Sequence, residues 1–171
     1  MKKLLLIFTL ILTSSTPAQA STGWRYWGYF QSAPGASSWS YALTGPTTNV
    51  ADGSVEGWAF TFSGDAVPDA ATPKIAPNFT SICAGTKSVV GKKRVGVIID
   101  FGPASLRPQG EKLPHSLSKC VVIEKNATGM EILGSIAKLR TSSSGYICGI
   151  NSYPAKECGT EVKTPRTLLK K

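Results

Sequence analysis

An export signal at the start of the chain determines where the rest of it must fold. Two lysines precede an uncharged apolar run over residues 4–13, and a polar stretch with a proline leads to Ala-Gln-Ala at 18–20. This order is typical of a secretory signal peptide, and cleavage is predicted between Ala20 and Ser21. A membrane-spanning helix needs about 20 apolar residues, and this run has half that length. We therefore predict that residues 1–20 are removed and that the mature protein is secreted.

The four cysteines are the second constraint on the fold. All of them lie beyond the signal, and an even number of cysteines in a secreted chain predicts disulfides. We favour Cys148–Cys158, because the glycine, asparagine and proline between them let the chain turn back, and Cys83–Cys120 then remains. The alternative is a zinc site, which needs closely spaced pairs such as C-x-x-C, and the sequence has none.

Length and charge limit the number of domains and the kinds of partner. Without its first 20 residues the chain of 171 suits a single domain, over residues 21–160. The net charge of +9 falls to +7 once the two lysines of the signal are removed. Most basic residues are scattered, so no nucleic-acid partner is expected, although an anionic surface could attract the basic tail. That tail, residues 161–171, lacks a packing pattern and is predicted to be disordered and dispensable for folding.

Apolar and aromatic runs predict a sheet. The run over residues 93–101 is almost continuously Val and Ile, which indicates a central strand buried on both faces. The predicted strands are 24–30, 39–43, 55–62, 93–101, 120–124 and 146–150.

One helix is predicted after the strand over residues 120–124. Thr128 and Glu131 have the spacing of a capping box, and an apolar helical stripe continues to Leu139. Residues 78–84 are expected to add one or two helical turns. Together these elements predict an α+β single domain with a mixed or antiparallel sheet of about five or six strands and one or two helices, held by disulfides.

The polar residues form no recognisable catalytic constellation. His115 is the only histidine, and nothing near it in its proline-rich loop predicts a nucleophile or an orienting acid. Asp100-Phe101-Gly102 matches a kinase motif, but the glycine-rich phosphate loop and the H-R-D sequence of kinases are missing. Asp100 is therefore predicted to cap or turn the chain at a strand end. We predict no catalytic residue, no metal site and no cofactor.

An aromatic cluster is the best candidate for a binding site. All four tryptophans lie between residues 24 and 58. Trp and Tyr combine a flat apolar face with a hydrogen-bonding group, which suits ring-shaped ligands. Side chains alternate along a strand, so residues 24–30 place rings on both faces, and one set stays exposed unless all of them pack in the core. The predicted ligand-binding residues are Trp24, Arg25, Tyr26, Trp27, Trp39, Tyr41 and Trp58.

The same aromatic runs contribute to a family resemblance. The segments WRYWGYFQ, GASSWSYALTGP, DGSVEGWAF, KRVGVIIDFG and GYICGINSYPAKECG resemble those of an uncharacterised family of secreted actinobacterial proteins, over most of residues 23–159. Such proteins are often encoded beside energy-coupling-factor vitamin transporters, so the resemblance implies a role near small-molecule uptake and a transporter partner. The family-pattern positions are the four cysteines and Trp24, Trp27, Gly28, Trp39, Gly53, Glu56, Gly57 and Trp58.

A weaker resemblance concerns the order of the elements. The predicted helix followed by YICGI is similar to part of the transcobalamin C-terminal-like domain, and the aromatic runs resemble its aromatic hairpin in permuted order. This resemblance implies binding of a large ring cofactor such as a corrinoid.

Three functions remain open from the sequence. The first is a secreted, non-enzymatic protein that binds a small molecule or an envelope component, as an accessory to a vitamin-type transporter. The second is a small secreted hydrolase, which requires a cleft with converging polar groups. The third is a structural or adhesive surface module.

Overall fold

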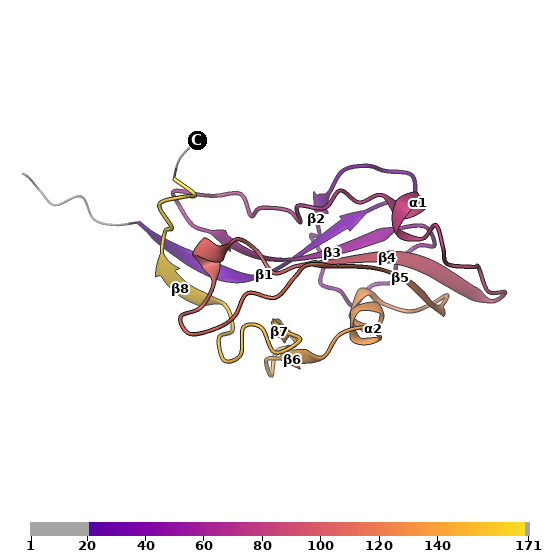
Figure 1. Cartoon of the computed structure of the whole chain (residues 1–171). Coiled ribbons are helices and arrows are strands. Elements are labelled where there is room, and N and C mark those ends of the chain that lie inside the picture. The colour runs from indigo at the N-terminus through magenta and orange to yellow at the C-terminus, as the bar shows by residue number, and fades with distance from the viewer. Residues whose placement is uncertain (1–20, 170–171) are drawn as a thin grey trace, which may run out of the picture.

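The computed structural model describes residues 21–169. The predicted signal peptide, with the Ala20 side of its cleavage site, lies outside the described residues, as do residues 170–171. The described chain forms one α+β domain, as predicted (Figure 1). Its elements are β1 (Thr22–Ser32), β2 (Ser40–Tyr41), β3 (Val55–Ser63), α1 (Phe79–Ile82), β4 (Lys92–Asp100), a 3-10 turn (Ala104–Leu106), β5 (Leu117–Glu124), α2 (Gly129–Gly134), β6 (Leu139–Thr141), β7 (Ile147–Ile150) and β8 (Thr160–Lys163).

Six strands form one mixed sheet. Its order is β2-β1-β3-β4-β5, and β8 pairs with the first residues of β1. Strands β3 and β4 are parallel, while the other neighbours in this sheet are antiparallel. Strand β4 lies between β3 and β5, and its Val95, Val97, Ile98 and Ile99 are all 0% exposed. The predicted central strand is therefore confirmed, because only a strand covered on both faces can bury such a run.

One face of the sheet, which we call the core face, packs against α2 and the separate β6–β7 sheet, below it in Figure 1. Tyr29 of β1 and Trp58 of β3 stack there with ring centroids 4.4 Å apart. Helix α2 contributes Ile132 and Leu133, both 0% exposed. Burying large side chains of this kind is worth about 1.5–3 kcal/mol each, so this layer supplies much of the stability.

The opposite face, which we call the loop face, is covered mainly by the long segment 64–91 that contains α1 (Figure 1). Small residues let this irregular segment lie close to the sheet. A Cβ atom at Gly57 would come within 2.9 Å of Pro73 and within 2.7 Å of the ring of Trp39, which precedes this segment. One at Gly96 would come within 3.4 Å of Ile82. Glycine at these positions therefore leaves the room that the covering side chains occupy.

Two disulfides connect these layers to the sheet. Cys83–Cys120 joins the end of α1 to β5, and Cys148–Cys158 joins β7 to the segment before β8. Both predicted pairings are confirmed, and no cysteine among the described residues is free.

Helix α2 is shorter than the apolar stripe predicted. The capping box is present, because Glu131 accepts from the backbone N–H of Thr128 at 2.7 Å and Thr128 accepts from that of Glu131. The helix ends at Gly134, and Asn151 then bonds both the N–H and the C=O of Lys138, at 2.9 and 2.8 Å. These tertiary bonds direct the following residues into β6. Neither helix in residues 21–169 is long and apolar enough to cross a membrane.

The expectation of a disordered tail from residue 161 is not met. Residues Thr160–Lys163 form β8, which pairs with Thr22–Arg25 of β1, and Leu168 packs against the core. The bonds of this ladder come from the backbone, and a short edge strand needs little apolar alternation. Side-chain patterns therefore gave no sign of it.

Removal of residues 160–171 is expected to lower the thermal midpoint, because it deletes the β8 ladder and the Leu168 contact. A loss of about 2 kcal/mol corresponds to a shift of about 4–8 °C for a domain of this size. Deletion of residues 170–171 alone serves as the control and should leave the midpoint unchanged. If both deletions leave it unchanged, the tail is dispensable after all.

Candidate ligand-binding site

Three of the seven predicted binding residues lie on the core face. Trp27 is 8% exposed and donates from Nε1 to the backbone oxygen of Tyr153 at 3.1 Å, and Trp58 is 2% exposed. Arg25 forms an ion pair with Glu157 and donates to it from Nε at 2.7 Å. Packing and internal contacts occupy these side chains, so the structure does not bring them to a binding surface.

The other four predicted residues lie on the loop face. Trp24 is 53% exposed and Tyr41 is 50% exposed, whereas Tyr26 and Trp39 are half-buried. Tyr26 and Tyr41 line a shallow hollow of about 250 Å³ together with residues 68–70. Burial raises the pKa of Tyr41, and the neighbouring Tyr26 adds to this rise. The sheet thus splits the aromatic cluster instead of presenting it as one platform.

A mostly apolar cavity of about 220 Å³ lies where β3 extends past the end of β4. The parallel pairing of these strands ends at Ala59 and Asp100, so the following residues of β3 have no neighbour from β4. The covering segment and the chain after β4 diverge around this point and enclose the space. Apolar walls of the cavity include Ala59, Val67, Pro103, Leu106 and Leu168.

Thr61 lines this cavity and has a buried polar atom without a partner among the described residues. Its side chain lines the cavity and is 2% exposed, and its Oγ1 has no hydrogen-bond partner within residues 21–169. A buried hydroxyl without a partner costs about 1–3 kcal/mol. A bound molecule with a hydroxyl or a carbonyl group would satisfy it. The cavity is therefore mostly apolar, and the polar residues in its lining are Thr61, Asp69, Thr72, Lys74 and Asp100.

Asp100 holds two walls of the cavity in place. Its Oδ2 accepts from the backbone N–H of Lys74 at 2.8 Å, and its Oδ1 accepts from that of Gly102 at 2.9 Å. The hydroxyl of Ser116 also donates to Oδ1, at 3.4 Å. Asp100 is 4% exposed, so these hydrogen bonds take the place of the ones that water would make to its carboxylate. The prediction that Asp100 turns and caps the chain at a strand end is confirmed.

The strongest electrostatic perturbation lies in the core. Glu56 is 1% exposed, accepts from the Tyr29 hydroxyl, and accepts from Nε2 of Gln31 at 3.2 Å. Burial raises the pKa of Glu56 to about 7, although the bonds from Tyr29 and Gln31 and the charge of Lys93 oppose the rise. No ligand can reach this carboxyl group without unpacking the core, so its role is structural.

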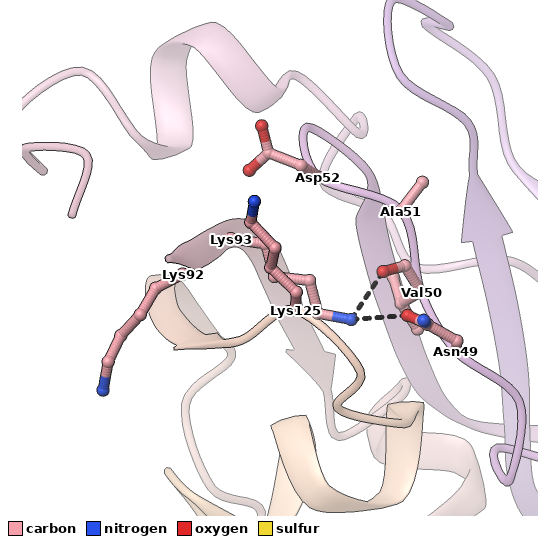
Figure 2. A pocket seen from close by; sticks show the side chains of 7 residues that line it. All are labelled: Asn49, Val50, Ala51, Asp52, Lys92, Lys93 and Lys125. Carbon is pink, nitrogen blue, oxygen red and sulfur yellow. Dashed lines mark hydrogen bonds between the residues drawn. The ribbon is translucent and has the colours of Figure 1, made fainter. Parts of the chain in front are cut away.

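Lys93 is a second buried charge with a structural role. It is 2% exposed, and burial lowers its pKa. Its Nζ donates to Oδ1 of Asn49 at 2.8 Å and to the backbone oxygen of Val50 at 2.6 Å (Figure 2). It also donates to the backbone oxygen of Ala127 at 2.6 Å. The open basic hollow beside it holds about 590 Å³. Because the Lys93 ammonium already donates three hydrogen bonds to neutral acceptors, we assign it a structural role. It holds the loop before β3 against the chain before α2.

The residues considered for catalysis do not converge in the described part of the chain. His115 is exposed, and the hydrogen bond of its neighbour Ser116 goes to Asp100. Both oxygens of Asp100 already accept backbone N–H groups. Within residues 21–169, no group of three or more His, Cys, Asp or Glu side chains could hold a metal ion.

Comparison with known proteins identifies the domain. A sequence model of the SCO2322-like domain matches residues 19–163, which include every strand from β1 to β8. The chain belongs to the SCO2322-like domain family. No curated protein and no solved structure matches it. The match to β8 agrees with the pairing of this strand to β1, and it makes residues 160–163 part of the SCO2322-like domain.

Several glycines of this SCO2322-like domain have clear structural roles. Gly53 has a φ of +84° in the turn before β3, a backbone conformation that favours glycine. Gly57 makes room for Trp39, as described above, and a Cβ at Gly28 would lie 3.0 Å from the Phe30 ring. Gly28 and Gly57 thus allow close packing of the loop face, and Gly53 allows the turn.

Sequence reasoning missed the residues of the cavity. Thr61, Leu106 and Leu168 were not among the predicted site residues. One signal was present in the small side chains of Gly57, Ala59 and Thr61, which share a face of β3 and leave space above it. Trp39 fills the space over Gly57, whereas the space beside Thr61 stays open. The path of the covering loop decides between these outcomes.

Proposed function

We propose that this SCO2322-like domain is a secreted, non-enzymatic protein that binds a small, mostly apolar molecule in the cavity beside Thr61. The supporting observation is a mostly apolar cavity lined by Thr61, whose buried hydroxyl has no hydrogen-bond partner among residues 21–169. Apolar pockets with a few polar groups are the usual form of small-molecule sites. The ligand class is a compact apolar body with one hydroxyl or carbonyl group.

The volume of the cavity limits the size of the ligand. At about 220 Å³, it is smaller than the about 300–1,000 Å³ of sites for drug-sized molecules. One or two small rings or a short chain would fill it. A corrinoid, which the transcobalamin resemblance implies, is too large for this cavity.

Two features support an extracellular setting for this function. The segment 1–20 has the sequence of an export signal, and both disulfides form as expected for an oxidising compartment. The family resemblance implies a vitamin-type transporter as the partner. In this proposal the domain captures its ligand outside the membrane and delivers it to that transporter.

Binding of 2-naphthol tests the proposed cavity, with amide chemical shifts as the measurement. We expect saturable shifts around Ala59, Thr61 and Val67. Naphthalene lacks the hydroxyl and should bind about 2–10-fold more weakly, since a hydrogen bond contributes about 0.5–1.5 kcal/mol. In Thr61→Val, which keeps the shape but removes the hydroxyl, this preference should disappear.

A filled cavity provides the decisive variant. Ala59→Leu adds atoms to the cavity wall and should abolish binding of 2-naphthol. Ala36→Leu makes the same change on an exposed loop and is the matched control, which should bind like the wild type. Thermal midpoints establish that both variants fold. Undiminished binding by a folded Ala59→Leu variant would place the ligand elsewhere.

A further inference from the structure

The outer edge of β1 has a gap in its strand pairing. Strand β8 pairs with Thr22–Arg25, and β2 pairs only from Phe30 onward. On that edge, no strand within the described chain pairs with residues 26–28. At about 3.3 Å per residue, the gap is roughly 10 Å long.

Trp27 directs its backbone hydrogen-bonding groups into this gap. On the same edge, the oxygen of Ser21 accepts from the N–H of Thr164 at 2.8 Å, and that of Tyr29 accepts from Ala42 at 3.0 Å. Residues of an antiparallel strand alternate in which edge they bond. The N–H and C=O of Trp27, which lies two residues before Tyr29, therefore point outward.

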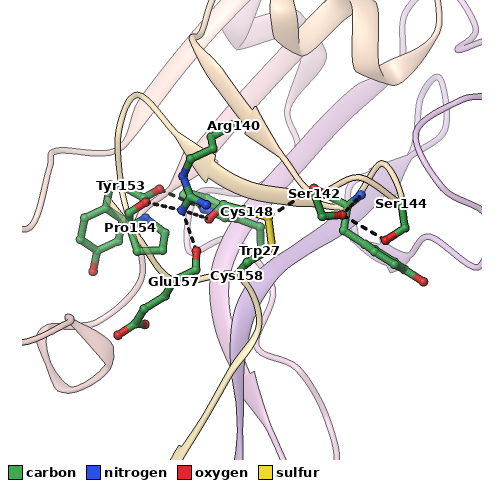
Figure 3. The surroundings of a disulfide bond; sticks show 10 residues. Trp27, Arg140, Ser142, Ser144, Cys148, Tyr153, Pro154, Glu157 and Cys158 are labelled. Carbon is green, nitrogen blue, oxygen red and sulfur yellow. Dashed lines mark hydrogen bonds between the residues drawn. A yellow bond between two sulfur atoms is a disulfide. The ribbon is translucent and has the colours of Figure 1, made fainter.

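A hollow of about 450 Å³ lies against the gap. Strand β1 forms one side, the turn between β6 and β7 forms another, and the chain at Cys158 and Gly159 adjoins them. Figure 3 shows Ser142 and Ser144 of this turn on one side of the disulfide, with Tyr153 and Pro154 on the other. The residues of the hollow that matter here are Tyr26, Trp27, Ser142, Ser144 and Tyr146.

The turn that bears Tyr146 is held by its own hydrogen bonds. The N–H of Ser142 donates to the backbone oxygen of Tyr146 at 2.9 Å, and the Ser142 hydroxyl accepts from the N–H of Tyr146 at 3.1 Å. Gly145 has a φ of +83°, which favours glycine. The side of the hollow that this turn forms is therefore already ordered before a ligand binds, which lowers the entropy cost of binding.

Arg140 fixes the chain on the far side of the Cys148–Cys158 disulfide. Its guanidinium donates to the backbone oxygens of Cys148, Pro154 and Glu157 at 3.1, 2.9 and 2.6 Å (Figure 3). These bonds and the disulfide hold β7 beside the segment that leads to β8. The two sides of the hollow therefore keep a fixed separation.

The chemistry of the hollow favours an uncharged, hydroxyl-bearing ring. Among residues 21–169, no Lys, Arg, Asp or Glu lines it, although the whole chain has a net charge of +9. Tyr146 is 73% exposed, so its ring is accessible to a partner. A sugar ring matches these features, because its C–H face stacks on an aromatic ring while its hydroxyls bond to serine hydroxyls and backbone groups.

The size of the gap disfavours an added peptide strand. Typical strands have about 5–6 residues, whereas here only Trp27 turns both backbone groups outward. A peptide could form just one pair of ladder bonds. A sugar ring needs no more than that.

We propose that this hollow binds a neutral oligosaccharide, with Tyr146 as the stacking ring and Ser144 and the Trp27 backbone as hydrogen-bonding groups. This site lies apart from the cavity beside Thr61, whose lining shares no residue with it. It gives the secreted domain a means to attach to neutral glycan of the envelope while the cavity holds a small molecule.

Titration of the full mature protein with N-acetylglucosamine trimer and with maltotriose tests the proposal. We expect at least one trimer to bind with a Kd of about 1 mM or tighter and to shift the amide signals of residues 142–146. Tyr146→Ala should weaken binding at least about tenfold by removing the ring. Tyr146→Phe keeps the ring and should change affinity less than about threefold.

Two controls make the result decisive. Tyr41→Ala removes a ring that is 50% exposed from the adjacent hollow and should bind the trimer like the wild type. Ala59→Leu, which fills the cavity, should also leave trimer binding unchanged, so failure of one proposed site is distinguishable from failure of the other. The proposal is overturned if neither trimer binds at about 10 mM, if Tyr146→Ala binds normally, or if only an extended Val/Thr-rich peptide binds.

Discussion

A variant with alanine at both Cys83 and Cys120 is expected to lose about 4 kcal/mol of unfolding free energy, because this disulfide closes a loop of 37 residues. The bond restricts the unfolded chain and also joins α1 on the loop face to β5. Such a loss corresponds to a thermal midpoint roughly 8–16 °C lower. Urea unfolding at neutral pH measures it directly.

The second disulfide is the matched control. Cys148–Cys158 spans 10 residues, so its double alanine variant should lose less, about 3 kcal/mol. The order of the two losses is the informative result. If the variant at Cys148 and Cys158 loses more, the β7 end of the molecule depends on its disulfide for reasons other than loop length.

Stability is expected to fall as pH rises through the titration of Glu56. Burial raises the pKa of this carboxyl group from 4.5 to about 7. Between these values the folded protein keeps a proton that the unfolded chain releases, so each step to higher pH favours unfolding. The protonated Glu56 contributes roughly 3 kcal/mol to the unfolding free energy. This contribution is fully present below about pH 4.5 and is lost as pH rises through about 7.

The Glu56→Gln variant isolates this effect. Glutamine keeps the shape but cannot ionise, so its unfolding free energy should vary less between pH 5 and 8 than that of the wild type, and it should exceed the wild type at about pH 8. Glu124→Gln replaces an exposed carboxylate that pairs with Lys92 at 3.0 Å, and should keep the wild-type slope. Parallel curves for Glu56→Gln and the wild type would contradict a protonated Glu56 in the folded state.

The sequence predicted the elements whose patterns are local. Residues that lie close together in the sequence define the Val/Ile run of β4, the capping box of α2 and the Cys148–Cys158 disulfide. Cys83–Cys120 was then the only pairing left for the other two cysteines. The length of α2 and the existence of β8 depend on distant partners, Asn151 for the first and Thr22–Arg25 for the second. No periodicity within either segment could indicate those partners.

The candidate site was harder to predict for a similar reason. Composition identified the aromatic cluster, but the strand register decides which rings are buried, and Trp27 and Trp58 pack in the core. The cavity beside Thr61 arises where β3 outruns β4, which no single segment encodes. Asp100 is the exception, because its place after a buried strand indicated that it would turn the chain.

Native mass spectrometry of the protein exported from cells tests the central claim most directly. We expect part of the wild-type protein to have one additional mass, from a single small and mostly apolar molecule. The Ala59→Leu variant should lack that mass, and the Ala36→Leu control should retain it. A wild-type protein without any bound molecule, or the same bound mass on Ala59→Leu, would contradict the claim that the cavity beside Thr61 is the ligand-binding site.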